Sequence, residues 1–335
     1  MKQFFDISLR PYNTFGIDSK ASRMVVVESR EDLMELLESG LLCKERFVVL
    51  GGGSNVVFTG DFNGTVVLMR NQEVRLLENG RVEAGAGMIL DDLVRYCSRN
   101  GLHGMENLTA IPGTVGASAV QNVGAYGLEA KDVIECVEAY DISSSEQRIF
   151  TNAECDFGYR WSVFKGALAG KYIIASVTYK LSREFSPTLC YQGLAKAMQE
   201  AGLEHPTAEE LIDLITDVRW AKLPKPGEVG SAGSFFKNPI VSREQHESLK
   251  QRYPDLVSFP AGENYKLAAG WLIEKSGWKG RTLNHAGVWA RQALVLVNAD
   301  GLASGKDVVA LADEVVRSVE QMFGVKLEKE AIIIE

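Results

Sequence analysis

A run of three glycines between two apolar segments most limits the fold of this chain. Phe47 to Leu50 and Val56 to Phe58 are short strand candidates, and Gly51 to Asn55 connects them as a tight turn. A Rossmann fingerprint needs glycines that open a long helix, so the β-branched residues after this turn argue against it. The consecutive backbone donors and the Ser54 hydroxyl form an anion-binding nest that suits a pyrophosphate.

Two further glycine-rich stretches lie downstream, IPGTVGASAVQNVGAYG at 111 to 127 and GSAGSFFKNP at 230 to 239. In the second we expect a turn that presents Ser234, Lys237 and Asn238, which offer a proton, a positive charge and hydrogen bonds to one bound molecule. Glycines let a ligand approach the backbone closely at a cost in stability. An ordinary surface turn is the alternative interpretation.

Length and composition indicate a soluble globular protein of about two domains. The chain has 335 residues, of which 46% are hydrophobic and 24% charged, and a net charge of −8 disfavours a general role on nucleic acid. No apolar run approaches the roughly 18 residues of a membrane span, and the first twenty residues lack a signal-peptide core. We therefore expect a cytoplasmic protein without membrane insertion.

Cysteine and histidine patterns predict neither a metal site nor a hydrolase. The spacing of these residues matches no disulfide framework, zinc ligand set or nucleophile signature, so reduced, buried thiols are expected. The residues concerned are Cys43, Cys97, Cys136, Cys155, Cys190, His103, His205, His246 and His285. Chemistry in this chain is therefore expected to depend on a bound organic cofactor.

Hydrophobic periodicity predicts an α+β architecture in three parts, starting with a β-α-β unit. Ser29 is the expected N-cap of a first helix, Asn79-Gly80 marks a hairpin, and Thr207 caps a later helix. We expect strands at 24–27, 47–50, 134–142, 172–181, 293–297 and 332–334, and helices at 29–37, 88–99, 207–220, 268–275 and 305–323. The expected domains are 1–66 with a returning C-terminal strand at 326–335, then 67–205, and 206–325.

Seven ordered motifs along almost the whole chain resemble one enzyme family. They are NTFGI at 13–17, LGGGSNVVF at 50–58, ENLTAIPGTVGASAVQNVGAYG at 106–127, FGYRWSVFK at 157–165, KLP at 222–224, GSFFKNP at 233–239 and LEKE at 327–330. The chain is similar to UDP-N-acetylenolpyruvoylglucosamine reductase, the MurB family of bacterial cell-wall synthesis. Tyr191, in a segment before the third part, resembles the longer type I form.

The resemblance implies a fold, a cofactor and a reaction. The fold is a vanillyl-alcohol-oxidase-like (PCMH-type) FAD-binding fold of two domains with a smaller α+β substrate-binding domain. FAD is bound without a covalent bond, and NADPH is the co-substrate that reduces the enolpyruvyl ether of UDP-N-acetylglucosamine enolpyruvate to a lactyl ether, giving UDP-N-acetylmuramate. Both substrates would use one pocket in turn, which implies ping-pong kinetics. A monomer is expected.

The resemblance also assigns roles to individual residues. Arg160 would hold the electron-rich carboxylate, for which a planar guanidinium is suited. Ser234 would donate the proton, and Glu330 would polarise and orient the substrate. Substrate-binding roles fall to Tyr191, Lys222 and Asn238. Cofactor-binding roles fall to Gly51, Gly52, Gly53, Ser54, Asn55, Pro112, Gly113, Gly116, Ser118, Asn122, Gly124 and Tyr126.

Two positions depart from the family pattern, and two other functions stay open. Ala119 stands where proline is usual, and Trp289 stands where a shorter or polar residue is often seen. A flavin-dependent oxidase of the same superfamily should lack the combination of Ser234 and Lys222. A catalytically silent UDP-sugar-binding protein would keep Lys222 and Tyr191 but lose the flavin.

Overall fold

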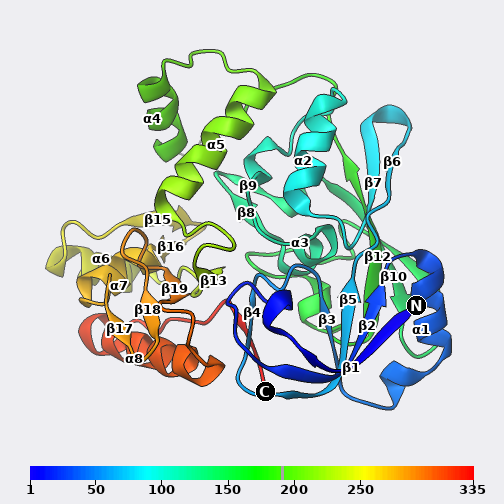
Figure 1. Ribbon diagram of the computed structural model, residues 1–335. Coiled ribbons are helices and arrows are strands. Elements are labelled where there is room, and N and C mark those ends of the chain that lie inside the picture. The colour runs from blue at the N-terminus through cyan, green and yellow to red at the C-terminus, as the bar shows by residue number, and fades with distance from the viewer. Residues whose placement is uncertain (190–191) are drawn as a thin grey trace. The chain divides into compact units, whose positions relative to one another are not determined.

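The computed structural model describes residues 1–189 and 192–335, and the chain divides into two compact units (Figure 1). Unit 1 comprises Met1–Ile7, Ala21–Gly52 and Asn63–Ala221. Unit 2 comprises Ser8–Lys20, Gly53–Phe62 and Lys222–Glu335. Each unit has its own hydrophobic core. In the described part of the chain, no helix combines the length and the apolar character needed to cross a membrane.

Two sheets form the framework of unit 1. The first has the order β1-β2-β5-β3, and β3 runs parallel to β5. The second has the order β11-β10-β12-β7-β6, and its neighbouring strands are antiparallel. The strands are β1 (Lys2–Ser8), β2 (Lys20–Val27), β3 (Phe47–Leu50), β5 (Phe62–Met69), β6 (Val74–Leu76), β7 (Arg81–Gly85), β10 (Ile134–Asp141), β11 (Gln147–Thr151) and β12 (Tyr172–Lys180). A short hairpin joins β8 (Gly124–Ala125) to β9 (Leu128–Glu129).

Two helices of unit 1 begin at hydroxyl residues that cap their first N–H groups. At α1 (Arg30–Glu38) the Ser29 hydroxyl accepts from the N–H of Asp32 at 3.2 Å. At α5 (Ala208–Lys222) the Thr207 hydroxyl accepts from the N–H of Glu210 at 3.3 Å. The remaining helices are α2 (Leu90–Arg99), α3 (Val115–Gln121) and α4 (Gln192–Ala201).

Unit 2 contains two small sheets, a parallel strand pair and three helices among the described residues. One sheet has the order β13-β19-β18-β17 and the other β14-β16-β15. The C-terminal β20 (Ile332–Ile334) pairs in parallel with β4 (Val56–Phe58). The other elements are β13 (Gly230–Ser234), β14 (Ile240–Val241), β15 (Ser258–Ala261), β16 (Asn264–Leu267), β17 (Thr282–Leu283), β18 (Ala286–Val288), β19 (Val295–Asn298), α6 (Arg243–Arg252), α7 (Ala269–Lys275) and α8 (Gly305–Phe323).

Most predicted elements are confirmed, and three predictions are wrong in detail. The Asn79-Gly80 hairpin joins β6 to β7, with φ of 58° and 72° at the two turn residues. The stretch 111–127 is not an uninterrupted loop, because it contains α3 and β8. Gly230 to Ser234 is a strand, not a turn. Cys97 and Cys155 are buried, but Cys43 is exposed, and Cys190 lies outside the described residues. The predicted domain limits stay a prediction.

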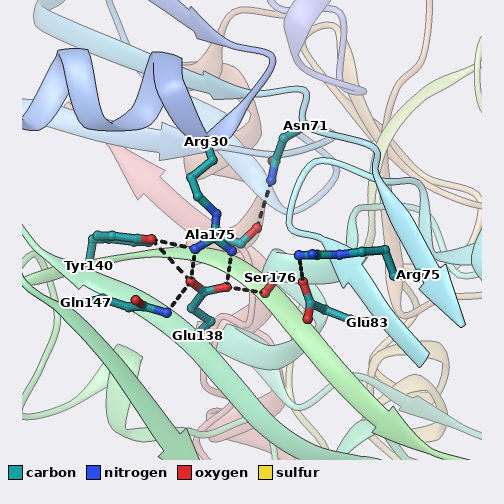
Figure 2. A network of polar contacts seen from close by, with 9 residues as sticks. All are labelled: Arg30, Asn71, Arg75, Glu83, Glu138, Tyr140, Gln147, Ala175 and Ser176. Carbon is teal, nitrogen blue, oxygen red and sulfur yellow. Dashed lines mark hydrogen bonds and ion pairs between the residues drawn. The ribbon is translucent and has the colours of Figure 1, made fainter. Parts of the chain in front are cut away.

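A buried carboxylate ties the start of α1 to the second sheet of unit 1. Figure 2 shows Glu138 of β10 accepting two hydrogen bonds from the Arg30 guanidinium, at 2.5 and 2.7 Å. Gln147 and the Ser176 hydroxyl each donate to the same carboxylate at 2.7 Å. Glu138 is 8% exposed, so its charge is stabilised by these donors and not by water. The hollow beside this network is lined by none of the residues predicted to bind a ligand.

Candidate active site

The first two glycine-rich stretches lie directly against each other in unit 1. A Cβ atom added to Gly51 would lie 2.1 Å from Oγ1 of Thr114, and one added to Gly52 would lie 3.2 Å from Cα of Gly113. Arg70 donates to the carbonyl of Gly51 at 3.0 Å. Gly51 therefore leaves room for the Thr114 side chain, and Gly52 lets the backbone of one stretch approach that of the other. The structure brings together the two loops that were predicted to bind the cofactor.

The second half of the first turn belongs to unit 2. Gly53 has a φ of 61°, and a Cβ atom there would lie 2.0 Å from the carbonyl oxygen of Tyr12. Ser54 is half-buried. Asn55 donates from its side chain to the carbonyl of Glu330 at 3.4 Å, and its own carbonyl accepts from Ile332 at 2.9 Å. The end of this turn is thus joined to the C-terminal segment that carries Glu330.

A strained alanine begins the second loop. Ala110 has a φ of 54°, a conformation that costs a residue with a Cβ about 1–3 kcal/mol. Asp91 accepts from its N–H at 2.6 Å, and Arg219 donates to its carbonyl at 3.2 Å. Burial works to raise the pKa of Asp91, but hydrogen bonds from Ala110, Thr109 and Arg95 outweigh it and hold that pKa below its usual range. The side chains of Asp91 and Arg219 therefore hold the backbone of Ala110 in place, just before Pro112.

Helix α3 packs closely on the strand that precedes α2. A Cβ atom on Gly116 would lie 2.8 Å from Cβ of Ala86, and the Gly116 N–H donates to the Ala86 carbonyl at 2.9 Å. The Ser118 hydroxyl donates to the carbonyl of Val115 at 2.7 Å and lies 3.4 Å from the hydroxyl of Tyr179. Because Ser118 is only 2% exposed, we infer that its side chain supports the loop from inside the protein.

Asn122 and Gly124 hold the segment that carries Arg160. The fully buried Asn122 donates to the carbonyl of Gly158 at 2.8 Å and accepts from the N–H of Lys131 at 2.9 Å. Arg160 donates to the carbonyl of Gly124 at 3.2 Å. Asn122 and Arg160 have φ values of 45° and 54°. The predicted carboxylate-binding arginine is therefore kept in a strained backbone position beside the second loop.

Arg219 is a site residue that the sequence reasoning did not select. Its guanidinium lies 6.0 Å from the ring centroid of Tyr126. Burial lowers the pKa of Arg219, a hydrogen bond with Tyr126 opposes this, and nearby Arg160 adds to the lowering. The Arg219 guanidinium therefore lies beside the Tyr126 ring. Arg219 precedes Lys222 by three residues on α5, and residues at this spacing are neighbours on a helix surface. This spacing from a predicted substrate-binding residue is the sequence signal that could have selected Arg219.

Ser234 lies in unit 2 at the end of β13, where the strand is irregular. The register with β19 shifts between Ser231 and Ser234, and Gly233 in between has a φ of 66°. Such a bulge turns a side chain out of the regular alternation of a strand. The two residues that follow, Phe235 and Phe236, are fully buried and fix the position of the serine.

The Glu330 segment runs beside the strand that carries Ser234. The N–H of Glu330 donates to the carbonyl of Phe235 at 2.8 Å, and the N–H of Lys237 donates to the carbonyl of Glu328 at 2.9 Å. Unit 2 therefore brings together the backbones at two of the three predicted catalytic residues, whereas Arg160 belongs to unit 1.

The predicted substrate-binding residues differ in their surroundings. Asn238 accepts through Oδ1 from the N–H of Ala269 at 2.9 Å, at the start of α7. Lys222 is exposed at the end of α5. Tyr191 lies outside the described residues.

Two family models match the chain, and together they define a flavin-binding oxidoreductase. Residues 21–148 match the FAD binding domain, a range that includes both glycine-rich loops of unit 1. Residues 225–334 match the C-terminal domain of UDP-N-acetylenolpyruvoylglucosamine reductase, a range that includes Ser234 and Glu330.

Curated relatives and a solved structure extend the similarity to nearly the full length. The chain is 45% identical to the UDP-N-acetylenolpyruvoylglucosamine reductase of Shewanella sp. (strain MR-7), covering 98% of this chain and 96% of the relative. It is 42% identical to the enzyme of the same name from Azoarcus sp. (strain BH72), covering 98% and 97%. The crystal structure of UDP-N-acetylenolpyruvylglucosamine reductase (MurB) from Thermus caldophilus matches with a TM-score of 0.67 and 26% identity, covering 100% and 98%. The chain belongs to the UDP-N-acetylenolpyruvoylglucosamine reductase family.

Proposed function

We propose that this protein reduces UDP-N-acetylglucosamine enolpyruvate to UDP-N-acetylmuramate with NADPH and FAD, in the synthesis of peptidoglycan precursors. The observation that carries the proposal is the hydrogen bond from the Glu330 N–H to the carbonyl of Phe235, the residue that directly follows Ser234. This hydrogen bond occurs in a chain that is 45% identical over its length to a reductase of that name. A monomer in the cytoplasm stays our prediction.

The residues of unit 1 fit a flavin. Gly52 lies against the backbone of Gly113, so peptide groups from the two glycine-rich stretches gather at one place. When bound there, FAD supplies the chemistry of hydride transfer from NADPH to the enolpyruvyl methylene carbon. The chain's own contribution is to bind, orient and protonate the substrate.

Three side chains carry the proposed chemistry. Arg160 binds the carboxylate on which negative charge develops, because its guanidinium offers two parallel N–H donors. The Ser234 hydroxyl donates a proton to the carbon next to that carboxylate. A serine is a weak acid, but a strongly basic carbon at hydrogen-bond distance is a sufficient acceptor. Glu330 orients the substrate, and its backbone bonds to Phe235 and Asn55 support that role.

An anaerobic two-step absorbance experiment tests the proposal. NADPH is added to the purified protein to bleach the flavin, and UDP-N-acetylglucosamine enolpyruvate is then added. Recovery of the flavin colour on the second addition supports the reductase. Bleaching that persists until air enters would contradict it and favour an oxidase, and a colourless protein would leave only a binding role.

A further inference from the structure

An indole N–H satisfies the carbonyl at the end of α5. Trp289 follows β18 directly, and its Nε1 donates to the backbone carbonyl of Lys222 at 2.9 Å. Lys222 is the last residue of α5, and the last four carbonyls of a helix have no partner within the helix. An indole is a donor only, so it suits such an acceptor.

The same tryptophan is connected to Ser234 through the β18–β19 hairpin. The N–H of Trp289 donates to the carbonyl of Val295 at 2.9 Å, and Val295 is the partner of Ser234 in the register of β19 with β13. The N–H of Phe235 donates to the carbonyl of Leu294 at 2.8 Å. Hydrogen bonds and strand pairing within unit 2 therefore connect the backbone of Lys222, through Trp289 and Val295, to the strand position of Ser234.

We propose that Trp289 is a positioning residue that sets Lys222 at a defined distance from Ser234. The proposal rests on the proposed function, in which the Lys222 ammonium meets the diphosphate of the UDP sugar while Ser234 meets the enolpyruvyl carbon. A sugar ring separates these two parts of the substrate, so its binding depends on the spacing between lysine and serine. Lys222 is exposed, and a long flexible side chain on a loose backbone would lose this spacing.

The surroundings of Trp289 support a role in nucleotide-sugar binding. The guanidinium of Arg291 lies 6.0 Å from the Trp289 ring centroid, so a cation lies beside the indole that bonds the Lys222 carbonyl. The ring itself is half-buried, and its backbone is fixed by the bond to Val295. Its orientation toward Lys222 is therefore set by the hairpin and does not need the substrate.

The test compares Trp289→Phe, which keeps an aromatic ring but removes the N–H, with the parent enzyme. Since a neutral hydrogen bond is worth roughly 1 kcal/mol, the KM for the UDP sugar should rise about three- to tenfold, with kcat nearly unchanged. Flavin content and thermal midpoint should stay at the parent values. Trp278→Phe is the matched control, because Trp278 is also half-buried in unit 2 and is not bonded to Lys222.

A double-mutant cycle shows whether the tryptophan acts through the lysine. On a Lys222→Ala background, Trp289→Phe should leave the KM unchanged. Trp289→His keeps a ring N–H and should recover part of the affinity lost in the phenylalanine variant. A parent-like KM for Trp289→Phe, or an equal rise on both backgrounds, overturns the proposal.

Failure of the proposed function would give a different result. In that case Lys222→Ala alone would not change the KM for the UDP sugar, or the parent enzyme would not reduce it. Loss of flavin in Trp289→Phe but not in Trp278→Phe would show that the tryptophan has a general structural role, and would equally overturn the positioning role.

Discussion

Gly51→Ala should strain the contact between the two glycine-rich loops that are predicted to bind the flavin. The added Cβ would lie 2.1 Å from Oγ1 of Thr114, far inside the distance that real side chains tolerate. Thr114 is β-branched and 1% exposed, so its side chain has little room to rotate away. Overpacking of this kind costs about 1–3 kcal/mol. The free energy of unfolding of unit 1 should fall by that amount.

Thermal unfolding and flavin content measure the effect. The midpoint should fall by roughly 2–12 °C, the shift that such a loss produces in a domain of this size. If the second loop moves to relieve the clash, FAD affinity should fall about tenfold for each 1.4 kcal/mol that is expressed in cofactor binding. Gly60→Ala is the matched control, since a Cβ atom there has no neighbour within 4 Å.

A second substitution, Thr114→Ala, should restore part of the stability and flavin content that Gly51→Ala removes. Thr114→Ala deletes Oγ1 at 2.1 Å and Cγ2 at 3.1 Å, so that only Cβ of residue 114, at 3.1 Å, remains near the new methyl group. The double variant should therefore be more stable and retain more flavin than Gly51→Ala. A parent-like Gly51→Ala, or a double variant no better than the single one, would refute the argument from loop contact.

Three further predictions concern the chemistry, an acid-sensitive loop and the buried network. Ser234→Ala should leave flavin reduction by NADPH intact and slow reoxidation by the UDP sugar, which stopped-flow absorbance measures; equal losses in both half-reactions would count against the proton-donor role. The pKa of Asp91 is lowered in the folded state, so its contribution to stability is full above the ordinary value of 3.8 and is lost as the pH falls through the folded pKa. Urea unfolding of the parent and Asp91→Asn should therefore differ by about 1 kcal/mol at pH 7 and converge under strong acid, and a constant difference would contradict this. Glu138→Gln should lower the free energy of unfolding, measured in urea, by about 1–3 kcal/mol, because it removes the charge of a buried carboxylate held by Arg30. Glu83→Gln, at a more exposed ion pair, should lower it by less than about 1 kcal/mol. Equal losses for the two variants would argue against a special role of the network.

Elements with local signals were predictable from the sequence. The Ser29 cap of α1 and the Thr207 cap of α5 need only a hydroxyl before a helical pattern, and both hydroxyls accept the expected N–H. The Asn79-Gly80 hairpin needs two residues that tolerate positive φ, and both have it. In these cases the residues that determine the structure are neighbours in the chain.

Helix α3 was not predictable in this way because its start depends on distant residues. Glycines and small side chains give the stretch from Val115 little helix propensity of its own. Its first N–H groups are satisfied by the carbonyls of Met88 and Ala86, which belong to the segment before α2. Ser234 presents a similar case, since the strand that carries it is defined by its pairing with Val295. Tertiary hydrogen bonds override local propensity in both places.

The candidate site also contains strain that no sequence pattern shows. Positive φ is expected at glycine, but Ala110, Tyr126 and Arg160 adopt it at 54°, 51° and 54°. Ala110 is held by Asp91 and Arg219, and the carbonyl of Tyr126 accepts from Asn107 at 2.9 Å. Glycine is thus used where two backbones touch, whereas side-chain hydrogen bonds enforce the same backbone region where a Cβ is present. Because such strain persists only when its surroundings hold it, we expect substitution of Arg219 to disturb the backbone at Ala110 and the predicted cofactor loop that follows it.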